Sequence, residues 1–93
     1  MIATTRFDAV EYLDTPERQA AYITAAFETG DPAFVRDAIG IVARARGMAE
    51  TAKLAELNRE SLYKALTPGA KPRFDTVLKV IRALGVKFTA QLT

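Results

Sequence analysis

The sequence predicts an all-α fold, with five to six compactly packed helices and a short β-strand at the C-terminus. Capping residues followed by proline open two helical stretches, at Thr15-Pro16 and Asp31-Pro32. Apolar residues then recur every three or four positions along most of the chain, which is helical spacing. With 93 residues, 49% of them hydrophobic and 26% charged, the chain has the size of a single domain, 1–93, with a hydrophobic core.

Residues 1–30 are predicted to form an acidic N-terminal helical extension. A short first helix is expected over Asp8–Leu13, with Asp8 as its N-cap. A longer helix follows, in which Thr15 caps the N-terminus and Pro16 takes the first helical position. Gly30 is the expected stop.

Residues 31–85 are predicted to form the core of the domain. Its first helix is capped by Asp31, begins at Pro32 and ends at Gly47. Gly40, inside this helix, costs about 1 kcal/mol relative to alanine. A glycine at that position is consistent with a neighbouring helix packed closely against it.

The stretch "MAETAKLAELNRESLYKAL", residues 48–66, reads either as one amphipathic helix or as two short ones. A single helix has to run through Leu57-Asn58, although asparagine is a poor interior residue and a good N-cap. The apolar register also breaks there, with separate short stripes before and after. We therefore predict two helices, 48–55 and 59–66, joined by a turn, which is the layout of a helix-turn-helix.

The second of these helices is predicted to have an exposed face and an anchored face. Arg59, Glu60, Tyr63 and Lys64 share the exposed side, while Leu62 and Leu66 point toward the core. A DNA-reading helix is built in this way, since its N-terminal residues meet base edges while the opposite face is held.

The C-terminal third begins with the loop "TPGAKP", followed by a helix whose apolar stripe ends before Gly85. That stripe consists of Phe74, Val77, Leu78, Ile81 and Leu84. In residues 86–93 apolar and polar positions alternate, which predicts a half-buried strand or a tail. A lone strand needs a partner strand, from a dimer mate or from another protein.

Several function classes are disfavoured by composition. The chain has no cysteine and no histidine, so it lacks the commonest metal ligands and the commonest general base. Ser61 and Lys64 match the S-x-x-K pattern of serine acyl transferases, but the other motifs of that chemistry are missing. We expect no enzyme activity, no cofactor and no metal. No membrane-length apolar run or signal-peptide core occurs, so a soluble cytoplasmic protein is expected.

The net charge of +2 conceals an asymmetry along the chain. Residues 1–43 hold three basic and seven acidic residues, a net of −4, whereas residues 44–93 hold ten basic and four acidic residues, a net of +6. A basic half suits a polyanion and an acidic half suits a basic partner, although two ordinary solvated surfaces would give the same pattern.

The chain resembles the HigA-like addiction-module antidote proteins in two stretches, "ARARGM…AKLAELNRESLYKALTPG…PRFDTVLKVIRALGVK" and "FDAVEYLDTPE…AAYITAAFETGDPAFVRDAIG". These belong to the wider lambda-repressor-like helix-turn-helix group, and the resemblance covers nearly the whole chain. It implies that 48–55 is the supporting helix and 59–66 the recognition helix. Two residues depart from the pattern: Glu56 stands where the turn usually has glycine, and Thr51 stands at a usually apolar position.

The resemblance and the residue chemistry together give a set of candidate DNA contacts. The base-reading candidates are Arg59, Glu60 and Lys64. The phosphate-binding candidates are Asn58, Ser61, Tyr63, Lys53, Lys71 and Arg73. Alternatives remain for several of them. Glu60 can instead stabilise the helix N-terminus or pair with Lys64, Tyr63 can be a packing residue, and the flanking cations can be plainly solvated.

The function that the resemblance implies is that of an antitoxin. Such a protein would neutralise a basic toxin similar to the RelE/ParE type and, as a homodimer, bind operator DNA to repress its own operon. Candidate toxin contacts are Asp8, Glu11, Tyr12 and Asp14. Two alternatives remain: a stand-alone phage-type transcriptional repressor, and a protein-interaction module that has lost DNA binding. Glu56 and Glu60, acidic residues near the expected DNA face, favour the last.

Overall fold

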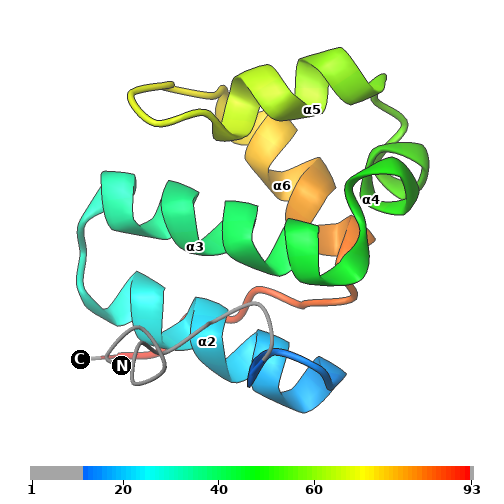
Figure 1. The fold of residues 1–93 in the computed structure, drawn as a ribbon. Helices are drawn as coiled ribbons and strands as arrows, with labels where there is room; N and C mark the ends of the chain where they lie inside the picture. The colour runs from blue at the N-terminus through cyan, green and yellow to red at the C-terminus, as the bar shows by residue number, and fades with distance from the viewer. Residues whose placement is uncertain (1–11, 93) are drawn as a thin grey trace, which may run out of the picture.

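The computed structural model describes residues 12–92, and in this range the chain is all-helical (Figure 1). In chain order the described helices are α2 (Pro16–Glu28), α3 (Pro32–Arg46), α4 (Met48–Ala55), α5 (Arg59–Leu66) and α6 (Phe74–Ala83). Most of the short helix predicted over Asp8–Leu13 lies outside the described residues. None of the described helices is long and apolar enough to span a membrane.

The first two described helices begin where their capping residues predict. The Thr15 hydroxyl oxygen accepts a hydrogen bond from the Arg18 N–H at 3.2 Å, and Asp31 Oδ1 accepts one from the Ala33 N–H at 3.0 Å. A proline follows each cap, in the first turn where a missing N–H costs nothing. Local sequence alone therefore determines both helix starts.

Gly47 forms the corner between α3 and α4, since it is both the C-cap of one helix and the N-cap of the other. Its φ of 106° and ψ of 121° lie in a region that residues with a Cβ rarely adopt. Its N–H donates to the Ala43 carbonyl at 2.8 Å, and its carbonyl accepts from the Thr51 N–H at 2.9 Å. One residue thus satisfies groups at the ends of two helices.

The helices form two groups around one core, with α2 packed on α3 and α4 packed on α6 (Figure 1). The largest fully buried side chains come from every described helix and from the segment before α2: Leu13, Ile23, Ile39, Leu62, Ile81, Val42, Val80 and Thr51. Because α2 contributes to this core, residues 12–30 are an integral part of the folded domain.

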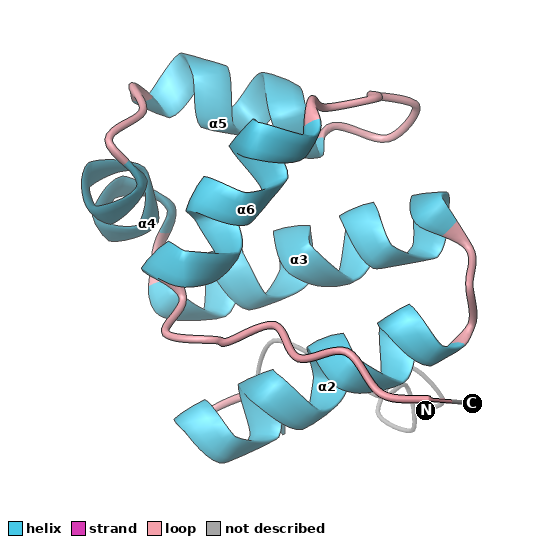
Figure 2. Ribbon diagram, turned by 180° about the vertical axis from the view of Figure 1, so that it is seen from behind, coloured by secondary structure: helices cyan, strands magenta, loops and turns pink. Residues whose placement is uncertain are grey.

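The predicted C-terminal strand is wrong over residues 86–92, which contain no strand. The described part of the chain is helical and offers this segment no sheet edge to pair with. The segment instead runs along α2 (Figure 2), where the rings of Phe27 and Phe88 meet edge to face with centroids 5.1 Å apart. Of the alternating apolar residues, Phe88 therefore packs on a helix rather than in a sheet, whereas Ala90 and Leu92 are exposed.

The apolar stripe of α6 is only partly in the core. Ile81 and Leu84 are buried, Val77 and Leu78 are half-buried, and Val80 is an additional buried residue. Phe74, the first residue of α6, is 72% exposed. A large apolar ring is thus left on the surface beside Leu78.

Gly40→Ala is expected to stabilise the protein by about 0.5–1 kcal/mol, because alanine is the better residue inside a helix. A Cβ added at Gly40 would lie 3.7 Å from Leu66 Cβ, an ordinary van der Waals contact, so α5 leaves room for the methyl group. Urea denaturation measures the change in the free energy of unfolding.

The matched control is Gly47→Ala, which has open space around its added Cβ but an unsuitable φ of +106°. This variant is expected to lose about 1–3 kcal/mol of stability. Equal changes in both variants would contradict the assignment of Gly47 as the position with special backbone geometry.

Candidate nucleic-acid interface

Helix α5 is held by one face and open on the other. Leu62 is fully buried, with 0% exposure, in the same core as Ile81 and Val42. On the opposite side the candidate side chains of α5 are all exposed: Arg59, Glu60, Ser61, Tyr63 and Lys64. The structure therefore brings all three base-reading candidates together on one exposed helix.

Asn58 caps α5 in the predicted manner. Its side-chain oxygen accepts a hydrogen bond from the Ser61 N–H at 2.7 Å. The cap stabilises the helix start by about 1 kcal/mol and leaves the Asn58 amide group and the Ser61 hydroxyl facing solvent. The N-terminal end of α5 is thus ordered and accessible, and it carries the positive end of the helix dipole.

The turn between α4 and α5 keeps a left-handed residue at the position where glycine is usual in the resembled family. Glu56 has φ 60° and ψ 41°, and within residues 12–92 it is the only non-glycine residue with positive φ. The Leu57 N–H donates to the Ala52 carbonyl at 2.9 Å, which closes the end of α4. The turn is therefore not reshaped by glutamate, and the strain of roughly 1 kcal/mol is tolerated.

Thr51, the second departure from the family pattern, is also accommodated. It is 1% exposed, and its hydroxyl donates to the Gly47 carbonyl at 2.8 Å. A hydroxyl satisfied within its own helix costs little to bury. The polar residue therefore leaves the core around α4 intact.

Arg59 and Tyr63 form a pair one turn apart on the exposed face of α5. The Arg59 Nη2 donates to the Tyr63 hydroxyl at 3.2 Å, and the guanidinium carbon lies 5.5 Å from the centroid of the Tyr63 ring. A hydrogen bond and a cation–π contact together restrict the arginine. Tyr63 is 45% exposed, so its ring is partly covered while its hydroxyl contacts Arg59.

The phosphate-binding candidates outside α5 lie on α4 and on the connection to α6. Lys53, Lys71 and Arg73 are all exposed. Arg36 on α3 donates to the Ala70 carbonyl at 2.9 Å, which ties the connection to the core beside Lys71. Arg73 already contacts Asp75, with Nε and Oδ1 3.4 Å apart, in a pair that is exposed to solvent and therefore weak.

Acidic residues also lie near this surface. Glu50, Glu56 and Glu60 are exposed on α4, the turn and α5. Among the ion pairs of residues 12–92, none joins Glu60 to Lys64, so the i,i+4 pairing considered from sequence is not formed. Both side chains are consequently available to a ligand.

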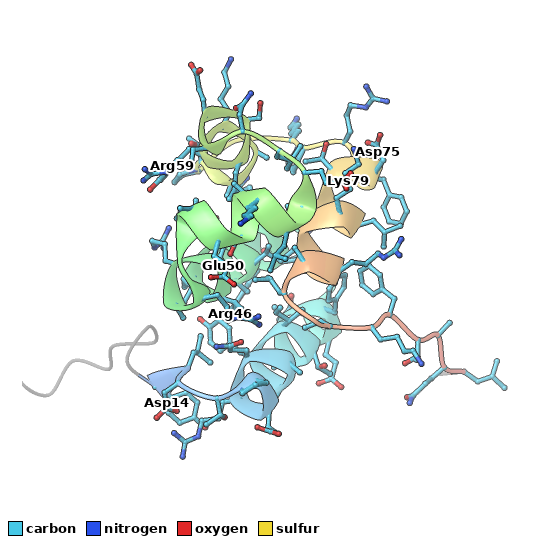
Figure 3. The ribbon with its side chains drawn as sticks, turned by 90° about the vertical axis from the view of Figure 1, so that its right-hand side faces the viewer. Asp14, Arg46, Glu50, Arg59, Asp75 and Lys79 are labelled. Carbon is cyan, nitrogen blue, oxygen red and sulfur yellow. The ribbon has the colours of Figure 1, made fainter. Side chains whose placement is uncertain are left out.

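The candidate toxin contacts lie at the other end of the molecule. Asp8 and Glu11 fall outside the described residues. Asp14 is exposed and pairs with Arg18 at 2.8 Å, and the Arg18 guanidinium also lies 5.0 Å from the centroid of the Tyr12 ring. Figure 3 shows Asp14 and Arg59 at opposite ends of the domain, so the two candidate sites are separate surfaces.

Arg46, the last residue of α3, has an internal role that the sequence did not predict. The half-buried Arg46 side chain donates to Gln19 Oε1 at 3.3 Å and to the Leu84 carbonyl at 2.9 Å. Gln19, buried in α2, in turn donates to the Leu13 carbonyl at 3.1 Å. No sequence pattern predicts hydrogen bonds between residues so far apart in the chain. These bonds could be found only from the structure.

The described residues include no group of three or more acidic, histidine or cysteine side chains arranged to hold a metal ion. The described fold and site define a small all-helical protein that presents a capped, cationic helix on its surface. A family model described as "Probable addiction module antidote protein" matches residues 3–92. The chain belongs to that family, and membership implies a toxin as its partner.

One curated relative, from Haemophilus influenzae and described as an uncharacterized protein, is 38% identical over 85 residues. The match covers 91% of this chain and 88% of the relative, so the similarity includes α2 as well as the helices around α5. A comparison with solved structures gives no match.

Glu56→Gly is expected to stabilise the protein by about 1 kcal/mol, because glycine adopts the left-handed conformation without strain. Glu56→Ala is the matched control, since it removes the same carboxylate but keeps the Cβ that causes the strain. Thermal unfolding of both variants separates the two effects. Equal melting temperatures for the two variants would show that the turn carries no strain.

Proposed function

We propose that this protein is the antitoxin of a type II toxin–antitoxin module, which binds its toxin directly and represses its own operon through sequence-specific DNA binding. The observation that carries the DNA-binding part is the geometry of α5, whose buried Leu62 anchors a helix with Arg59, Glu60 and Lys64 on its open face. The proposal treats α4, the turn and α5 as a lambda-repressor-like helix-turn-helix. The protein acts without enzymatic activity, in the cytoplasm where operator DNA lies.

In this function α5 enters the major groove and reads base edges from its N-terminal end. Arg59 is the main reader, because a guanidinium can donate two hydrogen bonds to guanine O6 and N7. Lys64 reads a base or holds a phosphate, and Glu60 accepts from cytosine N4. Lys53, Lys71 and Arg73 contact phosphates, which position the helix without reading sequence.

The toxin part of the proposal is supported by the family and by the acidic end of the chain. Between residues 12 and 43 the acidic side chains are Asp14, Glu17, Glu28, Asp31 and Asp37, against Arg18 and Arg36. Such a surface is complementary to a basic toxin of the RelE/ParE type. Tyr12 and Asp14 remain the candidate contacts within the described range.

The stand-alone repressor and the module without DNA binding predict different observations. A toxin-sized reading frame beside the gene favours the antitoxin, and its absence favours the stand-alone repressor. The module without DNA binding predicts equal, weak affinity for any duplex. Arg59 and Lys64 argue against it, since neither forms an ion pair with a carboxylate among the described residues.

Binding to the DNA upstream of the gene is expected to be tight, sequence-preferring and sensitive to salt. Affinity should fall by about a hundredfold or more between about 50 and about 200 mM salt, because phosphate contacts release counterions.

Arg59→Ala should weaken specific binding by about 1–3 kcal/mol and relax preference at one base position. Fluorescence anisotropy with the upstream duplex and a scrambled duplex measures the affinity, the sequence preference and the salt dependence.

Arg18→Ala is the control for this experiment, since Arg18 is exposed near the acidic end, far from α5. It should leave base preference unchanged and alter affinity far less than Arg59→Ala does. Equal affinity of the wild-type protein for both duplexes, with no effect of salt, would contradict the repressor role. Unchanged base preference in Arg59→Ala would remove Arg59 from the reading role.

Tyr63→Phe is expected to weaken specific binding by about 0.5–1.5 kcal/mol, the typical contribution of one hydrogen bond. The phenylalanine ring keeps the stacking with Arg59 but loses the 3.2 Å hydrogen bond. If Tyr63 acts only through Arg59, the change should have no effect in an Arg59→Ala background. A full effect in that background would assign Tyr63 a direct contact with DNA.

A further inference from the structure

The exposed side of α6 carries apolar and charged residues in two adjacent rows, which we call the α6 face. One row is Phe74, Leu78 and Arg82, and the other is Asp75 and Lys79, each spaced four residues apart. Phe74 is 72% exposed. Asp75, Lys79 and Arg82 are also exposed, and Leu78 is half-buried.

Further apolar surface adjoins the α6 face. Arg82 lines two shallow hollows, one shared with Leu54 and Lys79 and the other shared with Leu78 and Phe88. Leu54 is 53% exposed and Phe88 is 39% exposed. Large side chains from α4, α6 and the C-terminal segment therefore border one continuous surface, and exposed apolar patches of this kind mark interaction sites.

The charges on the α6 face are arranged so that the face complements itself. Asp75 and Lys79 are separated by one helical turn. If two α6 helices pack antiparallel about a two-fold axis that passes halfway between these residues, Asp75 of each copy lies opposite Lys79 of the other. In a two-fold dimer every contact occurs twice, so this arrangement produces two identical ion pairs. The apolar row of Phe74 and Leu78 lies beside those pairs.

The local partners of these charges leave them available. Asp75 contacts Arg73 at 3.4 Å and accepts a hydrogen bond from the Thr76 N–H at 2.9 Å, through the same oxygen, Oδ1. The pair with Arg73 is exposed and worth little. Lys79 forms no ion pair among the described residues. Asp75 Oδ2 and the Lys79 ammonium group are therefore available to another molecule.

We propose that the α6 face binds a second copy of this chain, with the two α6 helices antiparallel and Asp75 of each copy paired with Lys79 of the other. Phe74 and Leu78 are covered in this dimer. This inference rests on the proposed function at one point, which is that a repressor of this kind binds its operator as a dimer. Figure 3 shows Asp75 and Lys79 on the other side of the domain from Arg59, so the reading helices stay open.

A second copy fits this face better than a toxin does. The face carries both signs of charge, in positions that a two-fold axis matches, whereas a partner with one dominant sign would leave Asp75 or Lys79 against a like charge. One helix face is at the small end of specific interfaces. The dimer is therefore expected to dissociate measurably on dilution.

The test is a charge exchange measured by sedimentation equilibrium of the free protein, without DNA or toxin. Asp75→Lys and Lys79→Asp should each weaken the dimer by about tenfold or more, since each places like charges opposite one another. The double variant Asp75→Lys/Lys79→Asp should return to within about threefold of wild type, because the pairs are restored in reverse. Phe74→Ala, at an exposed position, should also weaken the dimer.

Glu28→Lys, the same charge change on α2, is the control and should leave dimerisation unchanged. Melting curves of the variants show that each is folded. A wild-type protein that stays monomeric at all accessible concentrations would overturn the proposal, as would a double variant no better than the single ones. A dimer insensitive to all the α6 changes would overturn it equally. DNA affinity is measured separately, so failure of the repressor role is distinguishable from failure of this interface.

Discussion

The single-residue corner at Gly47 is the constraint on which the rest of the domain depends. Its backbone conformation ends α3 and starts α4 without an intervening loop, and its carbonyl accepts both the N–H and the hydroxyl of Thr51. The direction of α4 therefore follows from one pair of dihedral angles. Because α4 is joined to α5 by only three residues, the same corner also sets where the exposed cations of α5 lie.

A second link connects the acidic end of the chain with this corner. Arg46, the residue before Gly47, is hydrogen-bonded to Gln19 on α2 and to the carbonyl of Leu84 at the end of α6. Three helices thus meet at one guanidinium, and α2 cannot shift without disturbing the position from which α4 begins. A half-buried arginine with two hydrogen-bond partners on distant segments would be costly to leave unpaired. The N-terminal part of the domain is consequently coupled to the part that carries α5.

Features governed by neighbouring residues could be predicted from the sequence, whereas features governed by distant ones could not. Proline after a capping residue located the starts of α2 and α3, and Asn58 located the break between α4 and α5. The strand was wrong over the described residues 86–92 because alternation of apolar and polar residues does not show what they pack against. Here Phe88 meets Phe27 of α2, while Ala90 and Leu92 are exposed. The contacts of Arg36 and Arg46 likewise depend on the fold, because each joins residues more than twenty-five positions apart. Of the candidate site, the residues on α5 were found by helical spacing, while the pairing of Arg59 with Tyr63 was not.

The placement of the charged surfaces bears on whether the two proposed partners, a toxin and operator DNA, would compete for one surface. The acidic residues before and on α2 lie at one end, the cations of α5 lie at the other, and the α6 face is on a third side (Figure 3). A basic protein bound near Asp14 would neutralise negative charge without covering Arg59. Removing negative charge from the complex reduces its repulsion from phosphates, which strengthens electrostatic attraction to DNA at low salt. The proposed toxin and DNA sites therefore lie on surfaces that do not overlap.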